Sequence, residues 1–356
     1  MECTEINNTV EKIILIAGSG IISFLIVLIF TPSFAEFLRK YKLGKQIREK
    51  TMTGEKAPLF AALHAKKSGT PTMGGLLILL SILITVGLSR ILSASGFIEH
   101  SLLNRKETWI PIFTLISCGI IGGIDDYMNI KGLGKLKGMS AKIKLLALIG
   151  FSAFGAYWFH YKLGINQLSI PIPGIEPIQI GWLYIPLFIL VLISTANAVN
   201  FTDGLDGLAA GLMIIAFGAF GILSYVQGLM ILAAFCAVVA GAIMGFLWFN
   251  VPPAKLFMGD AGAIGLGATL GVIAMLSDQV LILPIIGIIF VIEALSVIIQ
   301  LTSKKFFHRK VFKIAPIHHH FEQCGWQECT IVMRFWIIGG IFTLFGTILG
   351  LINLHY

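Results

Sequence analysis

Six aspartates are the residues of this 356-residue chain whose placement most clearly points to chemistry. Five of them stand beside long apolar runs: Asp125, Asp126 and Asp260, which have lysines nearby, and Asp203 and Asp206, which have none. Carboxylates placed near cationic side chains are what metal-dependent phosphoryl chemistry requires, because the oxygens hold the metal and the cations balance phosphate charge.

The first group lies in GGIDDYMNIKGLGKLKGMSAK. Adjacent Asp125 and Asp126 repel each other, so a cation must neutralise them or one must hold a proton, which would suit a proton acceptor. The lysines that follow, Lys137 among them, could receive phosphate. A solvated loop of mixed charge is the simpler alternative.

Two further segments carry the other aspartates. In NAVNFTDGLDGLAAG, Asp203 and Asp206 stand three apart, so on a helical turn both would project from one face, near Asn200. The alternative is a helix N-cap at Thr202 or Asp203. In NVPPAKLFMGDAGAIGLG, Asp260 is predicted to open a helix whose first amides suit an anion, although a lone aspartate there is most often a cap.

Polar residues of other types extend the set. KKSGTPTMGG places Lys67 and Thr72 where phosphate could meet a helix N-terminus. In APIHHHFE, consecutive histidines point in different directions, so phosphate or substrate contact is favoured over zinc, even with Cys324 and Cys329 nearby. A face with Glu293, Ser296 and Gln300 indicates either a functional site or interhelical hydrogen bonding.

Composition identifies the elements that must position these residues. The chain is 56% hydrophobic and 12% charged with a mean hydropathy of +0.90, whereas soluble domains carry about 25% charge. We therefore expect an all-α polytopic membrane protein forming one domain over residues 1–356, with a retained first helix and a small β-hairpin in LSIPIPGIEPIQIG. The predicted spans are 13–31, 72–91, 109–124, 143–160, 182–199, 208–225, 229–249, 263–277, 280–302 and 335–354.

The distribution of lysine and arginine predicts orientation. Five of the segments between spans hold 21 of the 26 basic residues, and cytoplasmic loops are enriched in such residues. These segments also carry the five aspartates. We therefore expect the active-site loops to be cytoplasmic, and both termini and the hairpin to be periplasmic.

The chemistry expected of this set is phosphoryl transfer at the membrane surface. Oxygen ligands select Mg²⁺, with Mn²⁺ as a second possibility. The chain has no GxxxxGK[ST] motif, so nucleotide hydrolysis by a P-loop is unsupported. A lipid phosphate is a natural acceptor, because its head group would sit where these loops begin.

Read together, DDYMNIKGLGKLKGMSAK, NAVNFTDGLDGLA, NVPPAKLFMGD and APIHHHFE resemble the polyprenyl-phosphate N-acetylhexosamine-1-phosphate transferases. The resemblance runs in motif order from about residue 67 to the C-terminus. KSGTPTMGG and APIHHHFE point to the branch that transfers phospho-MurNAc-pentapeptide from UDP-MurNAc-pentapeptide to undecaprenyl phosphate. The resemblance implies that lipid I and UMP are formed in peptidoglycan biosynthesis, in the bacterial cytoplasmic (inner) membrane, by a homodimer that depends on Mg²⁺.

The same resemblance implies roles for individual residues. Asp260 is the expected metal ligand and Asp203 a metal-proximal or nucleoside position, whereas Asp206 is expected to be structural. Asp125 and Asp126 are expected beside the metal and the acceptor phosphate, one of them as a possible base. His318 is carried over as a catalytic position. The remaining positions are expected to bind substrate: Lys67, Thr72, Lys137, Asn200, Asn250, Phe257, His319 and His320.

Two alternatives stay open. A related enzyme would use UDP-GlcNAc and a polyprenyl phosphate to transfer GlcNAc-1-phosphate. An ion-coupled transporter, which belongs to a different class, would use Glu293 and the aspartates as a relay. Transport predicts acidic residues spread through the membrane, and Glu293 is the only one expected deep within a span.

Overall fold

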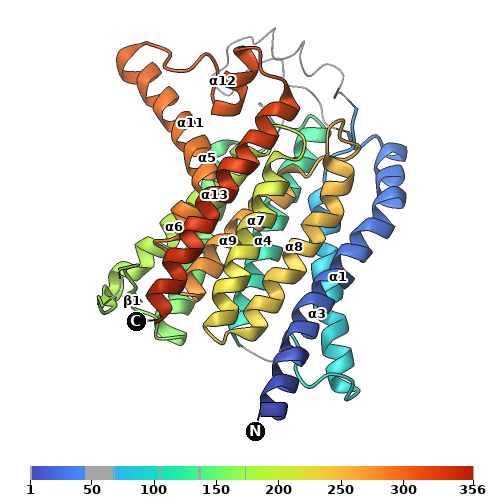
Figure 1. Cartoon of the computed structure of the whole chain (residues 1–356). Coiled ribbons are helices and arrows are strands. Elements are labelled where there is room, and N and C mark those ends of the chain that lie inside the picture. Colours follow the sequence, from blue (N-terminus) through green and yellow to red (C-terminus); the bar gives the residue numbers. More distant parts are fainter. Residues whose placement is uncertain are drawn as a thin grey trace.

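A computed structural model describes residues 2–44, 67, 69–103, 106–134, 138–172 and 174–355. Lys137, one of the predicted substrate-binding residues, lies outside them. The described chain is a bundle of long helices that run between two ends of the molecule (Figure 1). Sheet is confined to one small hairpin, so the predicted all-α class is confirmed.

The long helices follow the apolar runs closely. They are α1 (Glu2–Lys40), α3 (Gly74–Ala94), α4 (Lys106–Ile130), α5 (Ala141–Tyr157), α6 (Tyr184–Thr202), α7 (Leu208–Val226), α8 (Met230–Asn250), α9 (Gly259–Leu276), α11 (Ile288–Phe307) and α13 (Glu328–His355). The short elements are a π-helical turn (Trp158–Lys162), β1 (Gln167–Leu168), β2 (Ile178–Gln179), a 3₁₀ turn (Gly181–Leu183), α10 (Leu283–Ile286) and α12 (Ile317–Gln323).

Nine of the described helices are long and apolar enough to cross a membrane. They correspond to nine of the ten predicted spans, and the chain is a multi-pass membrane protein. The exception is 280–302, where the structure has the short α10, a break at Gly287 and then α11. Although α11 has twenty residues, it includes Glu293, Lys304 and Lys305. This helix is therefore not apolar enough to count as a span, because one of its faces is polar.

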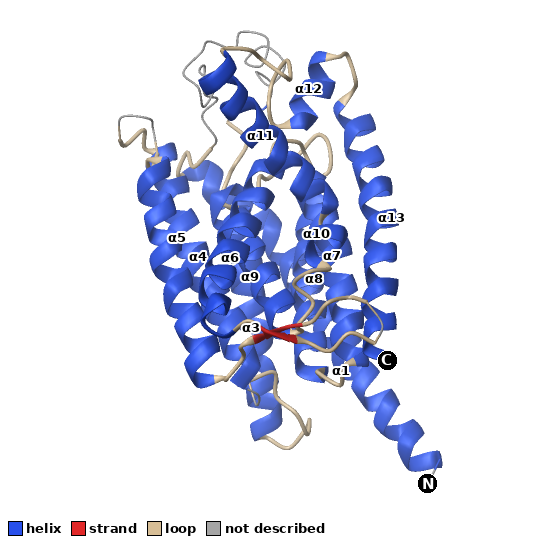
Figure 2. Ribbon diagram, turned by 90° about the vertical axis from the view of Figure 1, so that its left-hand side faces the viewer, coloured by secondary structure: helices blue, strands red, loops and turns tan. Residues whose placement is uncertain are grey.

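The two ends of the bundle differ in what they carry. Both termini and the hairpin lie at one end, while α12 and the adjoining end of α11 lie at the other (Figures 1 and 2). The hairpin is antiparallel, with Gln167 opposite Gln179. The sixth aspartate, Asp278, is at this end and accepts hydrogen bonds from the backbone amide and hydroxyl of Ser169. It therefore ties the α9–α10 turn to the hairpin segment.

The centre of the bundle is α9, which is buried along nearly its whole length. It packs most extensively against α4, where glycine permits very close approach. A Cβ atom on Gly122 of α4 would lie 2.2 Å from the carbonyl oxygen of Asp260. Backbone therefore lies against backbone at this point, and the end of α4 is held directly beside the start of α9.

Candidate active site

Asp125 and Asp126 lie in the last turns of α4, not in the loop that the sequence suggested. Both residues are buried, with 4% and 7% of the whole residue exposed. The alternative of a solvated loop of mixed charge is therefore wrong for these two residues. A carboxylate in such a position needs a specific partner, because its desolvation is otherwise uncompensated.

The partners of Asp126 are backbone amides at the start of α9. Its Oδ1 accepts from the Asp260 amide and its Oδ2 from the Ala261 amide, each at 3.0 Å. The first amides of α9, predicted to suit an anionic ligand, are thus occupied by a carboxylate of this chain. Gly259 has φ +77°, and a Cβ there would lie 2.5 Å from Asp126 Oδ2. This capping contact requires glycine at position 259.

Asp125 and Asp260 converge on one cation, the ammonium of Lys144 in the first turn of α5. Lys144 Nζ donates to Asp260 Oδ2 at 2.5 Å and forms a second ion pair with Asp125. Asp125 Oδ1 also accepts from the Met139 amide at 2.5 Å. Asp260 Oδ1 accepts from Asn200 Nδ2 at 2.9 Å. We call Asp125, Asp126, Lys144, Asn200 and Asp260 the carboxylate cluster.

The carboxylate cluster contains three carboxylates and one ammonium, and the ammonium contacts two of them, Asp125 and Asp260. Within the described part of the chain, no three His, Cys, Asp or Glu side chains converge as a preformed metal site. Mg²⁺, however, is commonly held by one or two carboxylates, with waters and substrate phosphates completing its shell. Two carboxylates already directed at one cation fit that requirement. Asp260 is the more accessible of the two, with 29% of its side chain exposed against 5% for Asp125.

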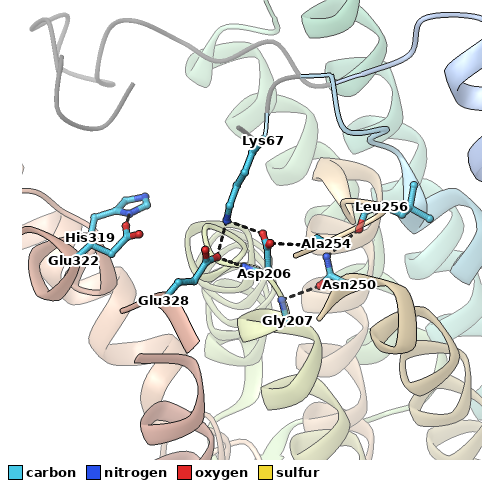
Figure 3. A network of polar contacts seen from close by, with 9 residues as sticks. All are labelled: Lys67, Asp206, Gly207, Asn250, Ala254, Leu256, His319, Glu322 and Glu328. Atoms are coloured by element: carbon cyan, nitrogen blue, oxygen red, sulfur yellow. Dashed lines mark hydrogen bonds and ion pairs between the residues drawn. The ribbon is translucent and has the colours of Figure 1, made fainter. Parts of the chain in front are cut away.

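A second group of polar residues joins four segments of the chain (Figure 3). Lys67 Nζ lies 2.7 Å from Asp206 Oδ1 and 2.6 Å from Glu328 Oε1. The same Glu328 oxygen accepts from the Asp206 amide at 2.7 Å, and Asp206 Oδ2 accepts from the Ala254 amide at 3.0 Å. Burial lowers the pKa of Lys67, but its two carboxylate partners outweigh burial, so the pKa stands above its ordinary value.

Asn250 extends this group towards the loop between α8 and α9. Its Oδ1 accepts from the Gly207 amide at 3.0 Å, and its Nδ2 donates to the Leu256 carbonyl at 2.9 Å. We call Lys67, Asp206, Asn250 and Glu328 the Lys67 network. Asn250 is 3% exposed and uses both ends of its amide inside the protein. The structure thus gives it a positioning contact, and its predicted role in substrate binding stays a prediction.

The turn between α6 and α7 differs from the expected helical turn. Asp203 ends α6 as its C-cap, and non-helical residues separate it from α7. The N-cap of α7 is Gly207 and makes no side-chain capping bond, so the predicted cap at Thr202 or Asp203 is wrong. Asp203 is half-buried, while Asp206 points into the Lys67 network. Asp206 has the structural role expected for it.

Thr72 and Phe257 lie where backbone segments meet. Thr72 is 6% exposed and its amide donates to the Leu43 carbonyl. The amides of Gly74 and Gly75, at the start of α3, donate to the carbonyls of Phe257 and Met258 at 2.8 Å. These amides are therefore already engaged, whereas the sequence suggested that phosphate would meet them.

The three histidines of α12 do point in different directions, as predicted. His318 is fully buried, with Nδ1 lying 3.0 Å from Glu293 Oε2 of α11. His319 Nδ1 lies 2.6 Å from Glu322 Oε2 (Figure 3). His320 Nδ1 accepts from the Lys313 amide at 3.2 Å. Cys324 Sγ lies 3.8 Å from His320 Nε2, but among the described residues no third His, Cys, Asp or Glu side chain joins them as a metal ligand.

The polar face of α11 holds the segment that leads to these histidines. Gln300 Nε2 donates to the Phe312 carbonyl at 2.9 Å, and its Oε1 accepts from the amides of Val311 and Phe312 at 3.0 Å. Glu293 lies further along the same face. The bonds of Gln300 thus run to the non-helical segment after α11, and the interhelical hydrogen bonding offered as one interpretation of this face is not what Gln300 makes.

Sequence reasoning missed two residues of these sites. Lys144 was counted only as a basic residue near a span, although a lysine in the first turn of an apolar helix is itself a signal, because an intramembrane charge needs a partner. Glu328 gave no local signal. It lies 261 positions from Lys67, and only the folded chain brings the two together.

Two family models match parts of this chain. The model of glycosyl transferase family 4 matches residues 108–278, which include the whole carboxylate cluster. Signature 1 of phospho-N-acetylmuramoyl-pentapeptide-transferase matches residues 67–79.

Curated relatives extend the match to nearly the full length. A protein of Shouchella clausii is 43% identical over 331 residues, covering 93% of this chain and 96% of the relative. One from Geobacillus sp. (strain WCH70) is 42% identical over 327 residues, covering 92% and 95%. One from Bacillus anthracis is 41% identical over 330 residues, covering 92% and 96%. All three are named phospho-N-acetylmuramoyl-pentapeptide-transferase, and this chain belongs to that family.

Proposed function

We propose that this chain transfers phospho-MurNAc-pentapeptide from UDP-MurNAc-pentapeptide to undecaprenyl phosphate, giving lipid I and UMP in peptidoglycan biosynthesis. The observation that carries the proposal is family membership over more than nine-tenths of the chain, with the carboxylate cluster inside the matched region. In the reaction, an oxygen of the lipid phosphate bonds to the sugar-bound phosphorus of the donor, and the bond from that phosphorus to UMP breaks.

The carboxylate cluster is suited to this exchange of one phosphoanhydride for another. Asp260 is the carboxylate that an incoming ligand can reach, and Asn200 and Lys144 fix its two oxygens. Asp126 orients Asp260 indirectly by capping the first amides of α9. With both oxygens accepting backbone hydrogen bonds, Asp126 is better suited to positioning than to proton transfer. Asp125 keeps the role of candidate base.

Asp260 and Asp125 would hold Mg²⁺, or Mn²⁺ in its place. A bound divalent cation would neutralise pyrophosphate charge and polarise the phosphoryl group. Asp203 was the other predicted ligand. It ends α6 three residues after Asn200, so it belongs to the same region, and its role as a ligand is part of this proposal.

We further propose that the end bearing α12 faces the cytoplasm of a bacterial inner membrane, with both termini periplasmic. The excess of basic residues in the loops at that end supports this orientation. UDP-linked donors are cytoplasmic metabolites, which requires the same orientation. A homodimer is proposed from the family alone.

The proposal is tested by turnover of the purified protein. We expect lipid-linked product, identified by mass spectrometry, from UDP-MurNAc-pentapeptide, undecaprenyl phosphate and Mg²⁺. Chelation should stop the reaction, and Mg²⁺ or Mn²⁺ should restore it. Turnover with UDP-GlcNAc but not with UDP-MurNAc-pentapeptide would overturn the donor assignment while keeping the reaction class.

The metal proposal has a test that does not depend on turnover. Binding of Mn²⁺ to the detergent-solubilised protein can be followed by electron paramagnetic resonance. We expect Asp260→Asn to weaken binding strongly and Asp278→Asn, at the other end of the molecule, to leave it unchanged. Equal binding by the wild type and Asp260→Asn would contradict the assignment of Asp260.

A further inference from the structure

His318 and Glu293 form a fully buried pair between α12 and α11. Neither side chain has exposed surface, and Nδ1 lies 3.0 Å from Oε2. The two are at ion-pair distance without the alignment of a hydrogen bond, and within the described chain their nitrogens and carboxylate oxygens have no other hydrogen-bond partner. Because an isolated polar group in such a place is costly, each side chain depends on the other.

The opposite edge of the imidazole lies against the turn between α6 and α7. A Cβ on Gly204 would stand 2.3 Å from His318 Nε2 and 2.8 Å from Cε1. The ring has little freedom to move, because it is fully buried and its centroid lies 4.1 Å from that of His319. The turn thus approaches the ring as closely as a residue without a side chain allows.

This turn also carries residues of the site. Asp203 precedes Gly204, and Asp206, two residues later, contacts Lys67 and the Ala254 amide. A chain of contacts therefore runs from Glu293 through the His318 ring to Gly204. Because the ring has no exposed surface, it contacts only buried groups around it, and the α6–α7 turn is the element that it can position.

We propose that Glu293 is a positioning residue that acts through His318: it holds the imidazole against Gly204 and thereby fixes the α6–α7 turn with Asp203 and Asp206. For the transfer reaction this inference rests on the proposed function above. The inference makes Glu293, Gly204 and His318 one unit, so the effects of substitutions at these residues on activity should not be additive.

The first test adds a methyl group to the contact. Gly204→Ala should lower kcat/KM by about tenfold or more, because the Cβ displaces the ring. In a His318→Ala background the methyl group has room, so Gly204→Ala should cause no further loss. The matched control is Gly218→Ala, since a Cβ at Gly218 meets nothing within 4 Å. Equal losses from Gly204→Ala in both backgrounds would overturn the proposal.

The second test replaces the carboxyl group of Glu293 by an amide of the same shape. Glu293→Gln should lower activity in the wild-type background and have no further effect with His318→Ala. Ser296→Ala alters the same buried face of α11, and the Ser296 hydroxyl donates to the backbone carbonyl of Glu293 and not to the carboxyl group that faces His318. It should leave turnover at the wild-type rate.

A measurement independent of turnover separates positioning from direct contact with substrate. Hydrogen–deuterium exchange reports the amides of Asp206 and Gly207, which donate to Glu328 and Asn250. Glu293→Gln and Gly204→Ala should each speed exchange in peptides covering residues 203–208. Unchanged exchange with reduced turnover would overturn the inference. If the wild type did not turn over the donor but the variants still showed faster exchange, the proposed function would be overturned and the positioning role of Glu293 would stand.

Discussion

The carboxylate cluster and the Lys67 network use the same kinds of groups, a lysine between two carboxylates with backbone amides around them, but they balance charge differently. In the Lys67 network, one ammonium and two backbone amides serve Asp206 and Glu328, and Asp206 is 4% exposed. In the carboxylate cluster, one ammonium contacts Asp125 and Asp260, two backbone amides bind Asp126, and Asp260 remains 29% exposed. An accessible carboxylate suits a cationic ligand, whereas a buried carboxylate whose hydrogen bonds are all made within the protein suits a scaffold.

The two groups also differ in what carries them. The carboxylate cluster is mounted on α4, α5, α6 and α9, and its spacing is set where the α4 and α9 backbones touch. The Lys67 network joins a segment before α3, a turn, a loop and the start of α13. Rigid elements hold catalytic groups more accurately than loops do. We therefore expect chemistry to depend on the first group and assembly on the second.

The largest effect is expected at Asp260. Asp260→Asn should reduce formation of lipid I by about 10³-fold, because the accessible charged ligand for a divalent cation is lost. The protein should still be made and purify as the wild type does. If Asp260→Asn kept activity within a few-fold of the wild type, the carboxylate cluster would be no more important for the chemistry than the Lys67 network.

A smaller loss is expected when the cap on α9 is disturbed. Gly259→Ala should lower kcat/KM by about 10- to 100-fold, because its φ of +77° and its contact with Asp126 both require glycine. Gly340→Ala is the matched control, since a Cβ there meets nothing within 4 Å. An equal effect of the two substitutions would show that α9 is not positioned by Asp126.

Breaking the Lys67 network should act mainly on stability. Lys67→Met leaves Asp206 and Glu328 close together without their cation, at a cost of about 2 kcal/mol. We expect the midpoint of thermal unfolding in detergent to fall by several degrees. Turnover measured well below that midpoint should drop far less than in Asp260→Asn. The reverse order, lost turnover with unchanged stability, would make Lys67 part of the chemistry.

The smallest effect is expected at Asp278, which serves as the reference carboxylate outside both groups. Asp278→Asn should leave turnover unchanged. Burial raises the pKa of Asp278, and hydrogen bonds from Ser169 only partly offset this. A raised pKa favours the folded state below the ordinary value of 3.8, and this contribution is lost as pH rises through the folded value. As pH increases through this range, the unfolding midpoint of the wild type should therefore fall by about 2 °C relative to that of Asp278→Asn.

Features with a local signal could be predicted from the sequence. Apolar runs of sufficient length predicted nine of the helices, and the alternation around Pro and Gly predicted the hairpin. Asp260 was predicted at the start of a helix and is found there. The broken span at 280–302 was missed because its hydrophobic pattern continues across Gly287, where the backbone departs from helical geometry.

Contacts between distant parts of the chain could not be predicted. Asp126 lies 134 positions from the amide it caps, Lys144 lies 116 positions from Asp260, and Lys67 lies 261 positions from Glu328. The hydrophobic periodicity of the sequence does not show which helix ends lie next to each other in the fold. The adjacent pair Asp125 and Asp126 correctly indicated that the two carboxylates need partners. The sequence could not say what the partners of Asp126 would be. The partners proved to be backbone amides, which any residue type supplies.

Both chain ends lie at the end of the bundle opposite α12, and the C-terminal end lies beside the hairpin (Figure 1). An affinity tag or a surface linker attached to either end would therefore leave the loops of the carboxylate cluster open. Immobilised through its C-terminus in a nanodisc, the protein would present that face to a flowing solution of donor. The way the chain begins and ends makes it well suited to surface-based screening of ligands.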